Sequence, residues 1–139
     1  YAYKLRFLQA LTAQVAKELQ AHPKLLVMGD FNIAPRPEDT HDPEQWEGKI
    51  LCSEPERAAL RSLCDLGLHD SFDALSSVPE QRFTWWDYRQ AGFRRNLGLR
   101  IDHLLLSDGL HAALRDWTVD LAPRRLERPS DHAPVIVTL

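Results

Sequence analysis

The sequence has few cysteines and no long apolar segment. Cys52 and Cys64 are the only 2 cysteines among 139 residues, too few for a disulfide framework, so we expect a reducing compartment. No apolar run reaches the ~18 residues needed to cross a bilayer, and no signal-peptide pattern opens the sequence. These absences predict a cytoplasmic protein that has no membrane partner.

The sequence also has no surplus of positive charge. Its formal net charge is −3, which taken alone argues against a nucleic-acid binder. The distribution is uneven, because residues 1–80 contain 8 Lys and Arg against 13 Asp and Glu, whereas residues 81–139 contain 9 Arg, no Lys and 7 Asp and Glu. Arginine binds phosphate oxygens through its planar fork. A phosphate-binding surface in the second part and a solvated face with ion pairs are equally good interpretations.

The length and the apolar content suit one domain. A chain of 139 residues with 44% hydrophobic residues can bury a core. We find no internal repeat, low-complexity tract or linker, so residues 1–139 are expected to form a single domain.

Hydrophobic periodicity predicts mixed α and β structure. One helix is expected over residues 3–20, and a second begins at the capping box Ser53–Glu56 and ends at Gly67. Residues 34–53 read as a long surface loop with one turn of helix around Trp46, and residues 68–72 as a short connector. The other expected elements are a turn over residues 76–79, a short helix ending at Ala113, a buried strand over 25–28, strands over 83–86, 99–106 and 117–121, and a strand over 135–139 buried on both faces.

Five polar side chains gather at predicted strand ends and loop corners: Asp30, Asn32, Asp102, Asp131 and His132. Each has an ordinary structural explanation. Asp30 and Asn32 suit an Asx turn, and Asp131 with His132 suits a turn after proline. Asp102 lies inside an apolar stretch, where an unpaired carboxylate is costly, so it needs a partner such as an arginine, a backbone amide or a histidine.

Taken together, these side chains favour metal-assisted hydrolysis of a phosphodiester. That reaction needs a cation on the non-bridging oxygens, an activated water and help for the leaving oxygen. Carboxylate and amide oxygens suit Mg²⁺ or Mn²⁺ rather than zinc. A histidine beside a carboxylate can carry positive charge against the phosphate when a second acid orients it, and Asp102 is the candidate for that acid.

Four motifs occur in one order: Gly29–Asn32, Phe83–Arg89, Asn96–Asp102 and Ser130–Val135. Together they resemble the exonuclease III family of DNA-repair nucleases, within the endonuclease/exonuclease/phosphatase superfamily, along essentially the whole chain. The resemblance implies an α/β fold of the DNase I type, a four-layer sandwich of mostly antiparallel or mixed sheets with flanking helices. This chain resembles only the C-terminal portion, about half of that sandwich.

The resemblance implies a Mg²⁺-dependent nuclease that cuts 5′ to abasic sites and trims 3′ ends of double-stranded DNA. In that interpretation Asp30 activates the attacking water or protonates the leaving oxygen, and Asn32 holds the phosphate. Asp102 orients His132, which contacts the scissile phosphate, and Asp131 contributes to the metal site.

The same resemblance assigns substrate contacts. Asn96 would support the phosphate from its loop, and Trp85, Leu99 and Ile101 would line a small apolar pocket for a flipped-out abasic sugar. Core packing is the alternative role for Trp85, and the sequence alone slightly favours it. Arg94 and Arg95 belong to the arginine-bearing loop that suits a DNA backbone.

The family's principal metal-binding Glu, an Asn on its first strands and a catalytic Tyr have no counterpart in this sequence. The resemblance therefore implies a fragment that is inactive or weak alone, with an uncovered sheet face that seeks a second copy or an N-terminal half. Two other interpretations stay open: a superfamily phosphatase acting on another phosphate ester, such as a lipid headgroup or an inositol phosphate, and a non-catalytic binding or assembly module.

Overall fold

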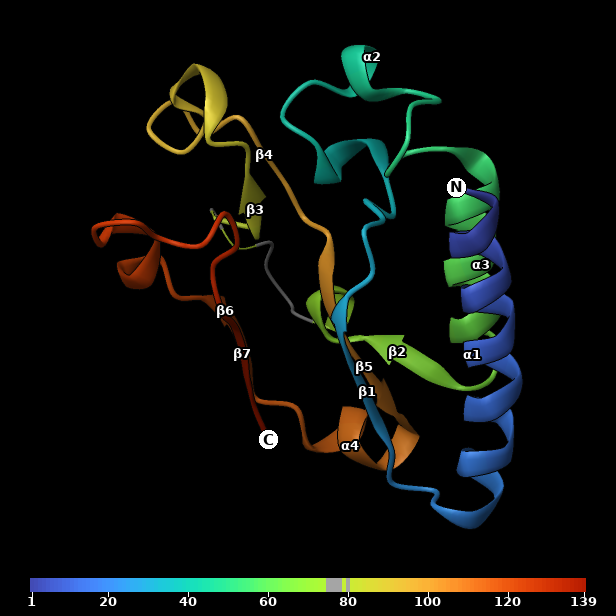
Figure 1. Ribbon diagram of the computed structural model, residues 1–139. Coiled ribbons are helices and arrows are strands. Elements are labelled where there is room, and N and C mark those ends of the chain that lie inside the picture. The colour runs from blue at the N-terminus through green and yellow to red at the C-terminus, as the bar shows by residue number, and fades with distance from the viewer. Residues whose placement is uncertain (75–78, 80) are drawn as a thin grey trace.

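Three small antiparallel sheets organise the chain in the computed structural model, which describes residues 1–74, 79 and 81–139 (Figure 1). The central sheet has three strands in the order β1-β5-β2. Strand β3 pairs with β4, and β6 pairs with β7. The mixed α/β class with antiparallel sheets is thus confirmed. The strands are β1 (Leu26–Asp30), β2 (Leu68–Asp70), β3 (Trp85–Trp86), β4 (Gly98–Leu99), β5 (Asp102–Ser107), β6 (Asp116–Val119) and β7 (Val135–Thr138).

Two long helices pack against each other on one side of the central sheet (Figure 1). They are α1 (Ala2–Ala21) and α3 (Glu54–Cys64), and two short helices, α2 (Pro43–Trp46) and α4 (Asp108–Ala113), lie in the connections. The apolar stripe of α1 meets that of α3 and the sheet in one core, because their helical spacing puts the large aliphatic side chains on one face. That core contains Leu8, Val15, Phe31, Ile33, Leu60, Leu63, Leu68 and Leu105.

The predicted helices and the capping box are confirmed. Ser53 Oγ accepts from the Glu56 N–H, and a Glu56 carboxylate oxygen accepts from the Ser53 N–H. The connector predicted over residues 68–72 is wrong: its first part is strand β2, followed by a 3₁₀ helix over Ser71–Ala74. The strand predicted over residues 99–106 is divided into β4 and β5. The turn predicted over residues 76–79 lies, apart from residue 79, outside the described residues.

Two predictions about burial are wrong. Strand β1 lies at an edge of the central sheet, and Met28 on it is 67% exposed. Strand β7 alternates between half-buried and exposed residues, and Ile136 is 46% exposed. A short apolar run reports how hydrophobic a strand is, but what covers it depends on distant elements.

No described helix combines the length and the apolarity that crossing a membrane would require.

A buried arginine accounts for the break between β4 and β5. The Arg100 side chain is fully buried, and its guanidinium donates to Asp39 at 2.8 Å and to Asp70 at 2.9 Å. Its backbone N–H donates to the Asp39 carbonyl at 2.8 Å, in place of a strand partner. Burial alone would raise the pKa of Asp39, but Arg100 and Arg82 hold that pKa below its ordinary value. The network ties the loop after β1 to the start of β5.

Candidate active site

Antiparallel register brings the first two site residues together. Asp30 ends β1 and Asp102 begins β5, and they are partners in the β1–β5 ladder. His132 arrives from a distant part of the chain: Ala133 N–H donates to the Thr84 carbonyl at 2.8 Å and Trp86 N–H to the Asp131 carbonyl at 3.0 Å. The central sheet therefore supplies two carboxylates, and pairing between the two later segments supplies the imidazole.

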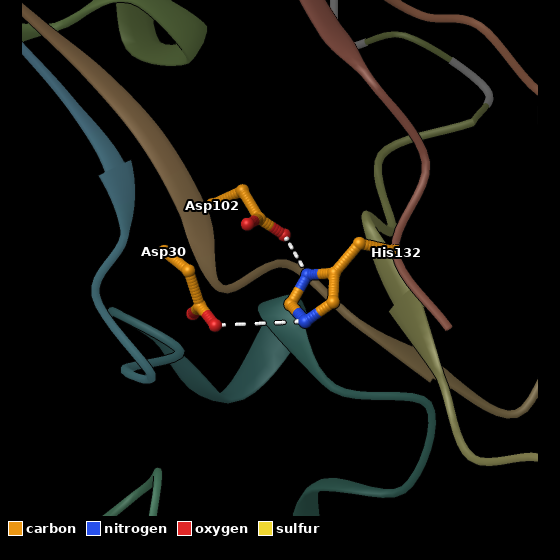
Figure 2. Close-up of side chains that lie close together, drawn as sticks. All are labelled: Asp30, Asp102 and His132. Carbon is orange, nitrogen blue, oxygen red and sulfur yellow. Dashed lines mark hydrogen bonds and ion pairs between the residues drawn. The ribbon is translucent and has the colours of Figure 1, made fainter. Parts of the chain in front are cut away.

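The imidazole of His132 lies between the two carboxylates (Figure 2). Its Nδ1 is 2.8 Å from Asp102 Oδ2, and its Nε2 is 3.5 Å from Asp30 Oδ2. A carboxylate only accepts, so Nδ1 carries the proton, and Nε2 is the atom turned toward Asp30. The hydrogen bond to Asp102 raises the pKa of His132, and burial opposes that rise only in part. The structure brings Asp102 and His132 together, and the role predicted for Asp102 in orienting the imidazole stays a prediction.

Asp30 forms the Asx turn that the sequence suggested, and it also faces His132. Its Oδ1 accepts from the Asn32 N–H at 2.8 Å, which is an Asx turn, while Oδ2 faces His132. Asn32 itself has φ of 53°, in the left-handed region that Asn tolerates better than most residues. Burial raises the pKa of Asp30, the Asn32 N–H lowers it, and the nearby Asp102 raises it further. A carboxyl with a raised pKa is suited to exchange a proton during a reaction.

Asp131 lies beside His132, but its carboxylate is hydrogen-bonded to the Trp85 indole. Its Oδ2 accepts from Trp85 Nε1 at 3.0 Å, and its Oδ1 is 4.0 Å from His132 Nε2. Among the described residues, Asp30, Asp102 and His132 have ligand atoms that all lie within 4.8 Å of one another, as a metal site requires. The metal role of Asp131 stays a prediction.

Sequence reasoning missed Thr84. Its side chain is fully buried, and Oγ1 accepts from the Ile101 N–H at 3.1 Å and from the Asp102 N–H at 3.2 Å. The hydroxyl thus provides the hydrogen-bond acceptor for two backbone N–H groups at the point where β4 and β5 separate, and one of them is the N–H of Asp102 itself. A threonine between two aromatic residues looks like any strand residue, so the sequence held no signal for this contact.

The residues predicted to form an apolar pocket lie together. Leu99 and Ile101 are almost fully buried in a core cluster with Ala34 and Cys52, and the partly buried Trp85 packs against that cluster. Trp85 therefore combines core packing with its hydrogen bond to Asp131. The part of an abasic sugar pocket that these residues would form stays a prediction.

The predicted DNA-facing residues occupy one loop. Arg94 and Arg95 are exposed, and Arg95 Nη1 donates to the Gln90 carbonyl at 3.3 Å. Asn96 Oδ1 accepts from the Trp86 indole N–H at 3.0 Å, so its side chain holds its own loop. The structure brings together Asp30, Asp102, Asp131 and His132 and places Arg94, Arg95 and Asn96 in the separate loop that precedes β4.

The carboxylate–imidazole group opens onto a cavity of about 500 Å³. Asp30, Asp102 and His132 line it together with apolar side chains such as Met28 and Val135. A large, mostly apolar hollow with a few convergent polar groups is typical of a ligand site.

Comparison with known proteins agrees with this geometry. Residues 1–132 match the family described as "Endonuclease/Exonuclease/phosphatase family". The chain therefore belongs to the endonuclease/exonuclease/phosphatase family.

Its relatives include an exodeoxyribonuclease III from Haemophilus influenzae, 39% identical over 95% of this chain and 52% of the relative. A 3′-5′ exonuclease from Neisseria meningitidis has a similar structure, with a TM-score of 0.94 and 51% identity over 99% of this chain and 53% of that one. An AP endonuclease from Archaeoglobus fulgidus has a TM-score of 0.89 and 33% identity over 99% of this chain and 54% of that one. These matches confirm the resemblance to exonuclease III, and the chain spans about half the length of each of these relatives.

Proposed function

We propose that this chain supplies part of the active site of a DNA-repair phosphodiesterase of the exonuclease III type. The observation that carries the proposal is the imidazole of His132, held between Asp102 at 2.8 Å and Asp30 at 3.5 Å. An oriented imidazole with a raised pKa, beside a carboxyl that can exchange a proton, is suited to stabilise and split a phosphate ester.

Each side chain has a distinct part in this proposal. Asp102 fixes the proton on His132 Nδ1, so that Nε2, when protonated, donates to a non-bridging phosphate oxygen. Asp30 takes the proton of the attacking water or gives one to the leaving oxygen. Asn32 lies on the same corner and binds the phosphate through its amide.

The residues present fit a hard divalent cation. The Asp30 and Asp131 carboxylates offer oxygen donors of the kind that Mg²⁺ and Mn²⁺ prefer. Burial, and to a smaller extent the like charge of Asp102, raise the pKa of Asp30. Ligand atoms of the Asp30 and Asp102 carboxylates lie within 4.8 Å of each other, so a cation would offset the negative charge gathered there. The ion would neutralise charge on the phosphate, with Asp131 and Asp30 as its proposed ligands in this chain.

The substrate we propose is double-stranded DNA with an abasic site or a 3′ end. Relatives named as a 3′-5′ exonuclease and as an AP endonuclease support both forms. A Neisseria structure 51% identical to this chain is described as a 3′ phosphatase bound to a product DNA hairpin. Arg94, Arg95 and Asn96 would meet the DNA backbone, and Trp85 with Leu99 and Ile101 would receive an abasic sugar.

We further propose that the isolated 139-residue chain is weak or inactive. It spans about half the length of its relatives, and few carboxylates hold Mg²⁺ poorly. Exposed apolar side chains on α1 and β1, including Tyr3, Phe7 and Met28, line a hollow of about 580 Å³. An N-terminal half or a second copy would cover this surface.

A cytoplasmic location is also part of the proposal. Cys52 and Cys64 are both free thiols, which agrees with a reducing compartment.

The decisive experiment is cleavage of a duplex that contains one abasic site, with a second duplex ending in a 3′ phosphate as a parallel substrate. The 139-residue chain is assayed in Mg²⁺ alone and with an N-terminal half from a family relative. Cutting that disappears with a chelator, in Asp131→Asn and in His132→Ala supports the proposal. If neither preparation cuts either substrate, the proposal of an enzyme is refuted.

Two further measurements separate the alternatives. Arg94→Ala with Arg95→Ala should weaken duplex binding and reduce its salt slope by about 2, since each arginine that contacts a phosphate contributes about one. An unchanged slope would favour a phosphatase that acts on small phosphate esters. The exposed α1–β1 surface favours an assembly module as a second candidate function, which predicts a mass that rises with concentration in light scattering.

A further inference from the structure

The first turn of α1 reaches the corner that carries Asp30 and Asn32. Lys4 Nζ donates to the backbone carbonyl of Asn32 and lies 2.5 Å from Glu56 Oε1. Lys4 is only 20% exposed and Glu56 is fully buried. A lysine from one helix thus bridges a buried carboxylate and a single backbone oxygen of the candidate site.

Glu56 is built to hold that lysine. Besides Lys4 it accepts from the Ser53 N–H, the Ser53 hydroxyl and the Leu51 N–H. Burial alone would raise the pKa of Glu56, but these donors, with Lys4 the strongest, hold that pKa below its ordinary value. The charged carboxylate is therefore fixed by the loop before α3, and the lysine amine is fixed in turn. Tyr1 adds a second tie between the two helices through the Ser53 hydroxyl, at 2.8 Å.

The corner itself depends on such contacts. Asn32 has φ of 53°, a left-handed conformation that an L residue adopts reluctantly. Its N–H donates to Asp30 Oδ1 at 2.8 Å, its carbonyl accepts from Lys4, and the next carbonyl, of Ile33, accepts from His103 Nε2 at 2.7 Å. The peptide is held from both ends, and the charge-assisted contact comes from Lys4.

We propose that Lys4, anchored by Glu56, is a positioning residue: by binding the Asn32 carbonyl it fixes the corner that aims the Asp30 and Asn32 side chains at the substrate phosphate. The inference rests on the proposed function, because that function supplies the substrate phosphate. The fixing of the corner rests on the contacts that Lys4 makes. Lys4 touches no reacting atom in this scheme. Misplacing a reacting group by about 1 Å can cost a hundredfold in rate, so a backbone contact of this kind can affect turnover.

The test uses the double substitution Lys4→Met and Glu56→Gln in the full chain. Lys4→Met alone would leave a buried, unpaired carboxylate and could unfold the protein. The pair removes both charges, and the amide oxygen left by Glu56→Gln can still accept from the Ser53 N–H and hydroxyl. Lys4→Arg is the conservative rescue. Lys17→Met, an exposed lysine of the same helix, is the matched control. Hydrogen exchange of the Asn32 amide is compared with that of Leu105 in the core, and kcat and KM are measured on the abasic duplex with the N-terminal half present.

We expect the Asn32 amide of the double variant to exchange about tenfold faster, the factor for one charge-assisted hydrogen bond, while the Leu105 amide is unchanged. We expect kcat of the double variant to fall about tenfold or more, with KM little changed. The Lys4→Arg variant should keep most of the parent kcat, and Lys17→Met should change neither kcat nor KM. Unchanged Asn32 exchange, or equal acceleration at Leu105, would overturn the inference. If the parent protein never cuts but exchange changes at Asn32 alone, the proposed function fails and the positioning contact stands.

Discussion

Replacing Asp102 by Asn keeps the size of the side chain and removes its charge. Asp102 Oδ2 accepts from His132 Nδ1 at 2.8 Å, and this hydrogen bond is the largest cause of the raised pKa of His132. An amide binds an imidazolium more weakly than a carboxylate does. The pKa of His132 should therefore fall in Asp102→Asn, and less of the imidazole should be protonated at neutral pH.

The structure sets the size of the effect. The Asp102 side chain is 19% exposed and that of His132 is 29% exposed, so solvent screens the contact only in part. A hydrogen bond to a charged group contributes about 1.5–3 kcal/mol. If that contribution is made in the transition state, kcat should fall about 10- to 100-fold.

Two assays check this prediction. An NMR titration of the His132 ring follows its pKa, and cleavage of the abasic duplex with the N-terminal half present follows kcat. Asp116→Asn, at an exposed position on β6, is the control. A histidine whose pKa is higher in the folded state stabilises the fold at pH values below its unfolded-state pKa. This stabilisation is lost as pH rises through the folded-state pKa. Asp102→Asn should therefore cost more unfolding free energy at pH 6 than at pH 9. A His132 pKa that stays the same or rises would refute the reasoning.

Three other predictions concern folding. Burial, and then the neighbouring Arg100, lower the pKa of His103, so this residue should reduce the free energy of unfolding as pH falls below its unfolded pKa of 6.5. Because His132 acts in the opposite direction, urea titrations at pH 7 and pH 5 would use the His132→Ala variant. Arg100→Met leaves Asp39 and Asp70 without their shared partner and should cost about 3–5 kcal/mol of unfolding free energy in chemical denaturation. Ser53→Ala removes the cap of α3 and should cost about 1 kcal/mol in the same assay, and a loss below the error of the method would contradict the capping role.

Local signals were enough to predict the helices. The apolar spacing of α1 and the capping box of α3 act within a few residues, so neither depends on distant partners. Strand β2 is different: Leu68–Asp70 carries no alternation of its own and becomes a strand because β5 offers it a partner. The division between β4 and β5 depends on the buried contacts of Arg100, which come from a loop far away in the sequence.

The candidate site was predicted as a set of residues rather than as a geometry. Chemistry alone required that Asp102 have a partner, and an arginine, a backbone amide and a histidine all met that requirement. The structure decides the matter through topology, because Arg100 is engaged by Asp39 and Asp70, and pairing of the segment around Thr84 brings His132 to Asp102. Side chains that meet across 30 positions of sequence, as Asp102 and His132 do, leave no local pattern.

The strands whose burial was wrongly predicted, β1 and β7, both border the candidate site. Strand β7, with the sequence Val-Ile-Val-Thr, is typical of a strand covered on both faces, yet Ile136 is 46% exposed, and Met28 on β1 is 67% exposed. Each Å² of apolar surface left in water forgoes about 25 cal/mol of stabilisation. The apolar side chains of these strands therefore contribute less stabilisation in this chain than full burial would give. Because Met28 and Val135 also line the cavity at Asp30 and His132, whatever covers these strands would close the candidate site from solvent as well.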